Sequence, residues 1–108
     1  MTDKELLELA AKAAGYIFDG LVLRNDETEF EYDGWNPLTD DGDALRLAVK
    51  LSLRTDCLRA EGYDKTTASQ CYAGNVIVNV GIDEGCGGDP YAATRLAITR
   101  AAAELGKP

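Results

Sequence analysis

The sequence predicts an α+β protein, a small α/β sandwich in which three helices pack on a mostly antiparallel sheet of about four to five strands. Two observations carry this prediction: helix caps followed by apolar runs in three places, and a middle stretch rich in β-branched and aromatic residues with turn signals between them. The expected order is α-β-β-α-β-β-β-α. A chain of 108 residues is predicted to form a single domain over 1–108.

The first helix is expected to begin with a capping box, in which Thr2 caps the helix and Glu5 lies three residues later. Gly15 is expected to end this helix, because glycine adopts the left-handed conformation common after a last turn. Two strands are then predicted, over 16–23 and 28–33, with a polar turn at 24–27.

The second helix is predicted to follow a rigid turn. Pro37 fixes its own φ and keeps Asn36 extended, so no helix can run through this point. Thr39 or Asp40 is expected to cap the helix, and acids at the positive end of the helix dipole stabilise it. Apolar residues then trace a wide face, which predicts a helix packed on a sheet: Ala44, Leu45, Leu47, Ala48, Val49, Leu51 and Leu53.

Three further strands are predicted near 57–63, 67–72 and 76–81, with turns at 64–66 and 73–75. The run 76–80 is apolar on both faces, which favours a central strand covered on both sides. The last helix is expected to be capped by Asp89 with Pro90 as its first residue, and to end at Gly106. Its many alanines would let it lie close against a sheet.

The net charge of −8 is confined to one window. Between Asp26 and Asp43 there are eight acids and no base, and the rest of the chain holds eleven acids and eleven bases. The favoured interpretation is a solvent-facing strand followed by helix-capping aspartates. The alternative is an acidic patch for a basic partner. Direct binding to nucleic-acid phosphates is disfavoured, because the sequence has no basic cluster.

Localisation in the cytoplasm is expected. The N-terminus is acidic and polar, unlike a signal peptide, and no apolar run approaches transmembrane length, so no membrane contact is predicted. The three cysteines, Cys57, Cys71 and Cys86, are odd in number and widely spaced, which matches neither a disulfide framework nor a zinc site. Cys57 and Cys71 are expected to be reduced core residues in opposed strands.

Two segments carry a resemblance. WNPLTDDGDALRLAVKL, from Trp35, and GGDPYAATRLAITRAAAELG, near the end, resemble the phage ABA-sandwich family of small bacteriophage and prophage proteins. The resemblance covers about a third of the chain and implies an α/β sandwich with helices packed around a sheet, and an origin in a phage or prophage. Because the family is defined by fold and genomic setting, the resemblance supplies no catalytic residues.

The sequence points to no catalytic or metal site and no cofactor. There is no histidine, the commonest general base and metal ligand. The aspartates Asp40, Asp41 and Asp43 lack the spacing of a calcium loop, so helix capping is favoured. The loop Gly85, Cys86, Gly87 and Gly88 precedes a helix and could cradle a phosphate, but it has no P-loop lysine and is flanked by acids.

Two functions follow as hypotheses. The first is a small non-enzymatic phage accessory protein that binds a host or phage protein, for example one of a host defence or regulatory system, through Glu29, Glu31, Asp33 and Trp35. For Trp35 the favoured role is that of a staple that folds its loop over the second helix, and the contact anchor is the alternative. The second function is a nucleotide or anion binder at the glycine loop. A virion role and a homodimer are also compatible with the sequence.

Overall fold

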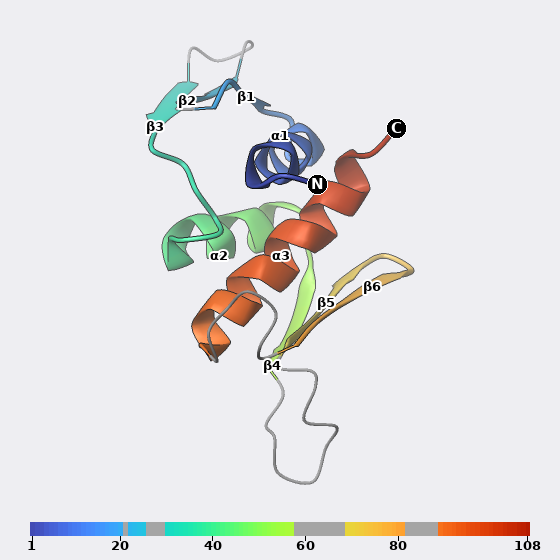
Figure 1. The fold of residues 1–108 in the computed structure, drawn as a ribbon. Coiled ribbons are helices and arrows are strands. Elements are labelled where there is room, and N and C mark those ends of the chain that lie inside the picture. The colour runs from blue at the N-terminus through green and yellow to red at the C-terminus, as the bar shows by residue number, and fades with distance from the viewer. Residues whose placement is uncertain (21, 26–29, 58–68, 82–88) are drawn as a thin grey trace, which may run out of the picture.

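The computed structural model describes residues 1–20, 22–25, 30–57, 69–81 and 89–108, and it confirms the α+β class. Along the chain the elements are α1 (Asp3–Ala13), β1 (Ile17–Phe18), β2 (Val22–Asn25), β3 (Phe30–Asp33), α2 (Asp41–Lys50), β4 (Arg54–Cys57), β5 (Ser69–Ala73), β6 (Val76–Val80) and α3 (Pro90–Gly106). Figure 1 shows α3 running diagonally across the molecule, with α1 and α2 beside it.

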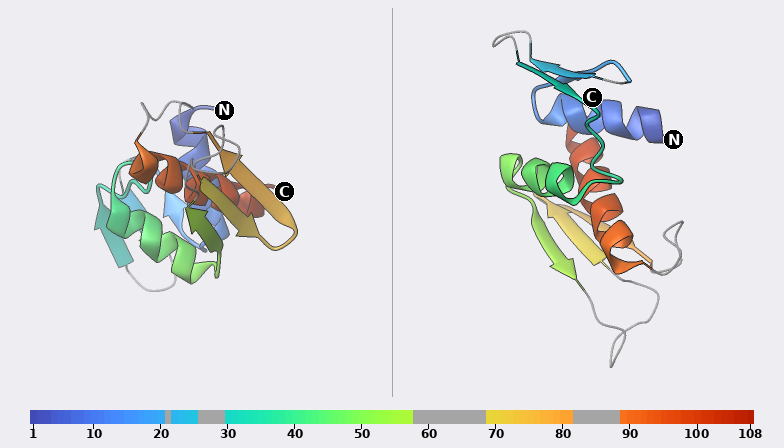
Figure 2. Two further views of the ribbon diagram at one scale, coloured as in Figure 1. Left: turned by 90° about the horizontal axis from the view of Figure 1, so that it is seen from below. Right: turned by 90° about the vertical axis from the view of Figure 1, so that its left-hand side faces the viewer.

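The described strands form two antiparallel sheets instead of the single sheet expected. Sheet A has the order β1-β2-β3 and sheet B the order β4-β5-β6. Sheet A lies against α1, and sheet B lies against α3, so the helices separate the two sheets (Figure 2). This stacking makes the molecule elongated, with extents of 48 × 27 × 23 Å.

The helix starts confirm the capping predictions. The Glu5 amide donates to Thr2 Oγ1 at 3.2 Å, and the Tyr91 amide donates to Asp89 Oδ1 at 2.9 Å. Asp40 is the cap of α2, because its Oδ2 accepts from the Asp43 amide at 2.8 Å. These contacts satisfy backbone donors that have no partner within the helix.

Small residues let α1 and α3 cross at close range. Ala10 and Ala11 of α1 are fully buried, as are Ala101 and Ala102 of α3. At the end of α3, a Cβ on Gly106 would overlap the carbonyl oxygen of Leu9. Gly106 is the last residue of α3, which confirms the prediction that the helix ends there, and its lack of a side chain also allows the close contact with α1.

Two strand predictions also need correction. The strand expected over 16–23 is interrupted by a turn, where Asp19 Oδ1 accepts from the Val22 amide at 3.0 Å and Gly20 has φ +99°. Consequently Arg24 and Asn25 belong to β2 and not to a turn. In sheet B, β6 is an edge strand among the described residues, although its apolar pattern favoured a central position.

Helix α2 buries a narrower face than predicted. Ala44, Leu47 and Ala48 are buried, whereas the side chains of Leu45 and Val49 are exposed. The contact of α2 with α3 and the anchoring of its first turn orient the helix so that these two residues face outward.

The two described cysteines differ in burial. Cys71 lies in the centre of sheet B and is fully buried, as predicted. Burial raises the pKa of its thiol, because a thiolate would lose its hydration. Cys57, by contrast, is exposed at the end of β4, so its assignment to the core is wrong.

Candidate functional site

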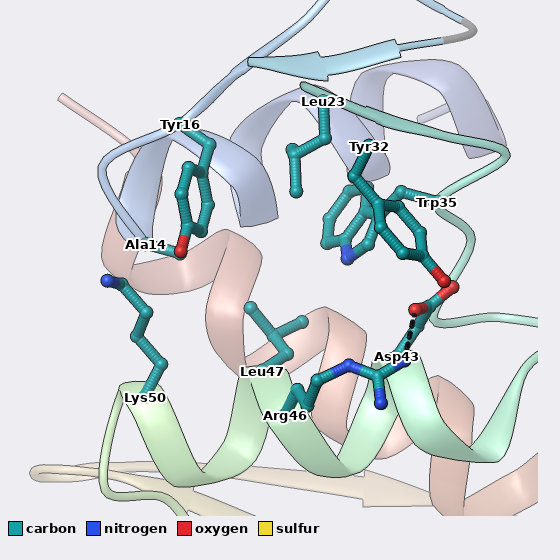
Figure 3. Close-up of a pocket in the computed structure, with 9 residues that line it drawn as sticks. All are labelled: Ala14, Tyr16, Leu23, Tyr32, Trp35, Asp43, Arg46, Leu47 and Lys50. Atoms are coloured by element: carbon teal, nitrogen blue, oxygen red, sulfur yellow. Dashed lines mark hydrogen bonds and ion pairs between the residues drawn. The ribbon is translucent and has the colours of Figure 1, made fainter. Parts of the chain in front are cut away.

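A cavity of about 110 Å³ lies between sheet A and α2 (Figure 3). Most of its wall is apolar or aromatic, and its charged groups come from α2. The lining residues are Ala14, Tyr16, Leu23, Tyr32, Trp35, Asp43, Arg46, Leu47 and Lys50. An engineered apolar cavity of roughly 150 Å³ holds benzene, so this smaller space encloses at most part of an aromatic ring, with the rest at its opening.

Asp43 fixes one end of the cavity. Its side chain is buried, yet it accepts from the Asn36 amide at 2.9 Å and from Arg46 Nη2 at 2.8 Å. The Asn36 amide is available because Pro37 prevents a helix from forming there. Asp43 therefore ties the loop before α2 to the first turn of that helix.

The Asp43 carboxylate also perturbs its neighbours. By accepting a hydrogen bond from the Tyr32 phenol, it raises the pKa of Tyr32, because ionisation would place two negative charges side by side. Its hydrogen bond with the Arg46 guanidinium raises the pKa of Arg46 in turn. Figure 3 shows the phenol oxygen of Tyr32 next to this carboxylate.

Aromatic rings form the wall toward sheet A. Trp35 is buried and meets the ring of Phe18 edge-on, with centroids 5.5 Å apart and planes inclined by 64°. At the other end, Lys50 Nζ lies 4.9 Å from the centroid of the Tyr16 ring, a cation–π contact. Figure 3 shows the indole nitrogen of Trp35 turned toward the cavity.

This arrangement is suited to binding more than to acid–base catalysis. A general base must be able to take a proton from a substrate, but Asp43 is engaged by the Asn36 amide, Arg46 and Tyr32. Within the described ranges, no group of three or more histidine, cysteine, aspartate or glutamate side chains could hold a metal ion.

A second hollow, of about 220 Å³, lies between α2, α3 and β4. Its lining includes Ala44 and Ile98, which are buried, and Leu45 and Tyr91, which are exposed by 63% and 69%. Val49, one turn after Leu45, is exposed by 69%. These three large exposed side chains on two adjacent helices are a candidate contact surface, called the α2–α3 surface below.

An ion pair closes one side of the α2–α3 surface. Arg95 of α3 donates through Nη1 to Asp41 Oδ1 at 2.7 Å and through Nε to the Leu38 carbonyl at 2.9 Å. Only 16% of the Arg95 side chain is exposed, so these contacts hold α3 to the start of α2. One side of the groove is therefore held by direct contacts between α3 and the start of α2.

Of the site residues predicted from sequence, the structure describes Glu31, Asp33 and Trp35, and it places the two acids at the surface and Trp35 in the core. Glu31 and Asp33 are exposed on β3, and the strand register places Glu31 opposite Arg24 of β2. Trp35 lies in the core, as expected if it acts as the staple that folds its loop over α2. Glu29 and the whole glycine loop, 85–88, lie outside the described residues.

The acids of the charged window have separate roles. Asp40 caps α2, Asp41 pairs with Arg95, and Asp43 is buried in the cavity wall. Sequence reasoning missed the burial of Asp43, although its spacing from Arg46, three residues later on a helix, indicated a contact.

Comparisons with family models, with curated proteins and with solved structures found no match. In the part of the chain that the structure describes, no helix has the length and apolar character needed to cross a membrane.

Proposed function

We propose that this chain is a non-enzymatic binding protein that acts by contact with a second protein through the α2–α3 surface. The observation that supports it most directly is the exposure of Leu45, Val49 and Tyr91 around an apolar groove. Large apolar side chains that gather on one face of a small protein commonly mark an interaction site.

The partner expected here presents apolar side chains for the groove and basic residues around them. Asp41 and Asp40 near the groove are paired with Arg95 and Arg46, so the attraction for basic residues comes from the net charge of −8 of the chain as a whole. Opposite charge on the partner would speed association and favour the correct orientation. Following the resemblance described above, we propose that the partner is a host or phage protein of a bacterial cell.

The first experiment compares two surfaces. A double variant, Leu45→Gln and Val49→Gln, keeps residues that favour helices but removes the apolar contact, and both sites are exposed, so folding should be unaffected. Its matched counterpart, Glu31→Gln with Asp33→Asn, neutralises the acidic face of sheet A. Each tagged protein is used to capture partners from a bacterial lysate.

The expected result is that the first variant loses the captured protein and the second retains it. The reverse result would move the contact to the acidic face of sheet A and reject the α2–α3 surface. Failure of the unmodified chain to retain any protein above the background of an unrelated acidic protein would contradict binding by contact.

A second candidate function is supported by the cavity beside α2. Its apolar walls and its donors, Arg46, Lys50 and the indole of Trp35, suit a small ring-shaped molecule with a negatively charged group. Thermal unfolding measured with benzoate and related aromatic acids tests this. Saturable stabilisation that is lost in Leu47→Phe, which would fill the cavity, supports it, and an unchanged melting temperature at millimolar ligand rejects it.

A further inference from the structure

The outer edge of β6 has the character of an interior strand. Its sequence, Val-Ile-Val-Asn-Val, contains no charge, no proline and no bulge, the features by which proteins usually protect sheet edges. The other edge of sheet B, β4, carries Arg54 and Asp56. Within the described part of the chain, nothing pairs with the outer edge of β6, and Ile77 is exposed by 53%.

A groove of about 500 Å³ runs beside this edge. Its lining is mixed, with slightly more polar than apolar surface, and its charged side chains balance, with two acids and two bases. The groove is lined by Ile77 and Val78 of β6, by Met1, Asp3 and Leu6 at the start of the chain, and by Leu96, Arg100, Ala103, Glu104 and Lys107 of α3. A strand added to β6 would direct side chains into this groove.

The balance of charge bears on which partner fits. In a protein of net charge −8, most surfaces repel a second copy. The groove is locally neutral and β6 is uncharged, so this face does not. A strand added there would pair the backbone donors and acceptors on the outer edge of β6.

We propose that β6 is the interface of a homodimer, in which two copies pair their β6 strands antiparallel across a two-fold axis and form one continuous six-stranded sheet. Such an interface uses the same patch on both copies. Pairing of five-residue strands covers little area, so the neighbouring groove supplies much of the roughly 1,200 Å² that a specific interface needs.

The hairpin geometry sets the register. Gly74, with φ +61°, and Asn75 form a two-residue turn between the paired residues Ala73 and Val76. The pair that flanks such a turn is hydrogen-bonded, and the pattern alternates along the strand, so the backbone groups of Ile77 and Asn79 point away from β5. A two-fold axis at Val78 places Ile77 of one copy opposite Asn79 of the other. The outward-pointing backbone N–H and C=O groups of these two residues would then hydrogen-bond across the interface.

The mass of the protein in solution, measured by sedimentation equilibrium over a range of concentrations, tests the dimer. The unmodified chain is expected to reach twice its mass of 11.6 kDa. Ile77→Lys places a charge on each copy at the interface and should raise the dissociation constant at least tenfold. Ile17→Lys is the matched control, because Ile17 is exposed by 43% on an edge strand of sheet A, and it should leave the dimer intact.

Disulfide trapping tests the register. With Cys57 and Cys86 replaced by serine, Val78→Cys should form an intermolecular disulfide on oxidation, because residues at the axis of a non-hydrogen-bonded pair have Cα atoms about 4.5 Å apart. Asn75→Cys, in the turn, should not. A monomer at all concentrations, or equal effects of Ile77→Lys and Ile17→Lys, would overturn the proposal, and neither outcome affects the α2–α3 surface.

Discussion

The two sheets have the same number of strands and the same connectivity, but they rest on the helical layer in different ways. Sheet A meets α2 through large aromatic side chains, Tyr32 among them, and leaves a cavity that Asp43 holds at one end. Sheet B lies against α3 through small side chains, with Cys71 and Ala73 buried at its centre. Large rings thus leave space for a ligand, whereas small residues allow close packing.

The sheets also differ in where their charges lie. Sheet A has Arg24, Glu31 and Asp33 on its strands, whereas β6 of sheet B has no charge at all. Charged side chains on an edge strand discourage the addition of another strand, so Glu31 and Asp33 disfavour pairing at β3, whereas β6 has no such charge. Four predictions sharpen this comparison, from the largest expected effect to the smallest.

Gly106→Val should destabilise both sheets together, because both depend on the crossing of α1 and α3. A side chain at Gly106 would overlap the Leu9 carbonyl, and forcing it into this packed contact is expected to cost about 3 kcal/mol of unfolding free energy. Urea unfolding followed by circular dichroism measures the loss. Leu105→Val, at the exposed neighbouring position, is the control, and equal stability of the two variants would refute the packing role.

Asp43→Ala should weaken the sheet A side alone. It leaves the Asn36 amide and the Tyr32 phenol without their acceptor, which is expected to cost about 2–3 kcal/mol. Arg46→Ala should cost less, since the Arg46 side chain is 66% exposed. Chemical denaturation of both variants checks the order, and a greater loss in Arg46→Ala would contradict the anchoring role of Asp43.

Raising the pH should weaken the sheet B side first. The raised pKa of Cys71 keeps its thiol protonated in the fold, while the thiol of the unfolded chain ionises near its ordinary value of 9.0. The unfolding free energy therefore keeps its full value with respect to this thiol below pH 9. Above pH 9 it falls by up to about 1.4 kcal/mol per pH unit until the folded thiol also ionises. The pKa of Tyr32 is also raised, so its phenol adds a further loss of stability, but only when the pH exceeds the ordinary pKa of 10.0.

The control for this pH effect is Cys71→Ala. It removes the buried thiol, so the fall in stability between pH 9 and 10 should become shallower in denaturation curves measured across that range. If the variant and the unmodified chain lost stability in parallel, ionisation of Cys71 would not be the cause.

Ser52→Gly should give a small gain. Ser52 follows α2 with φ +54°, a left-handed conformation that costs a residue with a side chain about 1 kcal/mol. Glycine adopts it without this cost, so the melting temperature should rise slightly. Ser52→Ala keeps the strain and should give no gain, and a gain equal to that of glycine would exclude backbone strain as the reason.

The sequence was sufficient to predict features that depend on a few neighbouring residues. The caps at Thr2, Asp40 and Asp89 were predictable because each cap bonds to a backbone amide two or three residues away. The α+β class followed from periodicity, which is also local. The turn at Asp19 and Gly20 was missed, although this pair is a common turn signal.

Features set by contacts distant in sequence were not predictable in this way. The outward orientation of Leu45 depends on how α2 meets α3, and the edge position of β6 depends on strand order. The cavity brings together residues from α1, sheet A and α2, and no motif marks that combination. The glycine loop and Glu29 lie outside the described residues, so the predictions made for them stay predictions.

The single tryptophan gives the chain a built-in optical probe of one corner. Trp35 is buried against Phe18 in the wall of the cavity between sheet A and α2, and the helices lie between the two sheets (Figure 2). Its emission should therefore respond when a ligand enters the cavity or when the loop before α2 loosens. Association through β6 should leave that emission unchanged, so one spectrum can tell events at the two ends of the molecule apart.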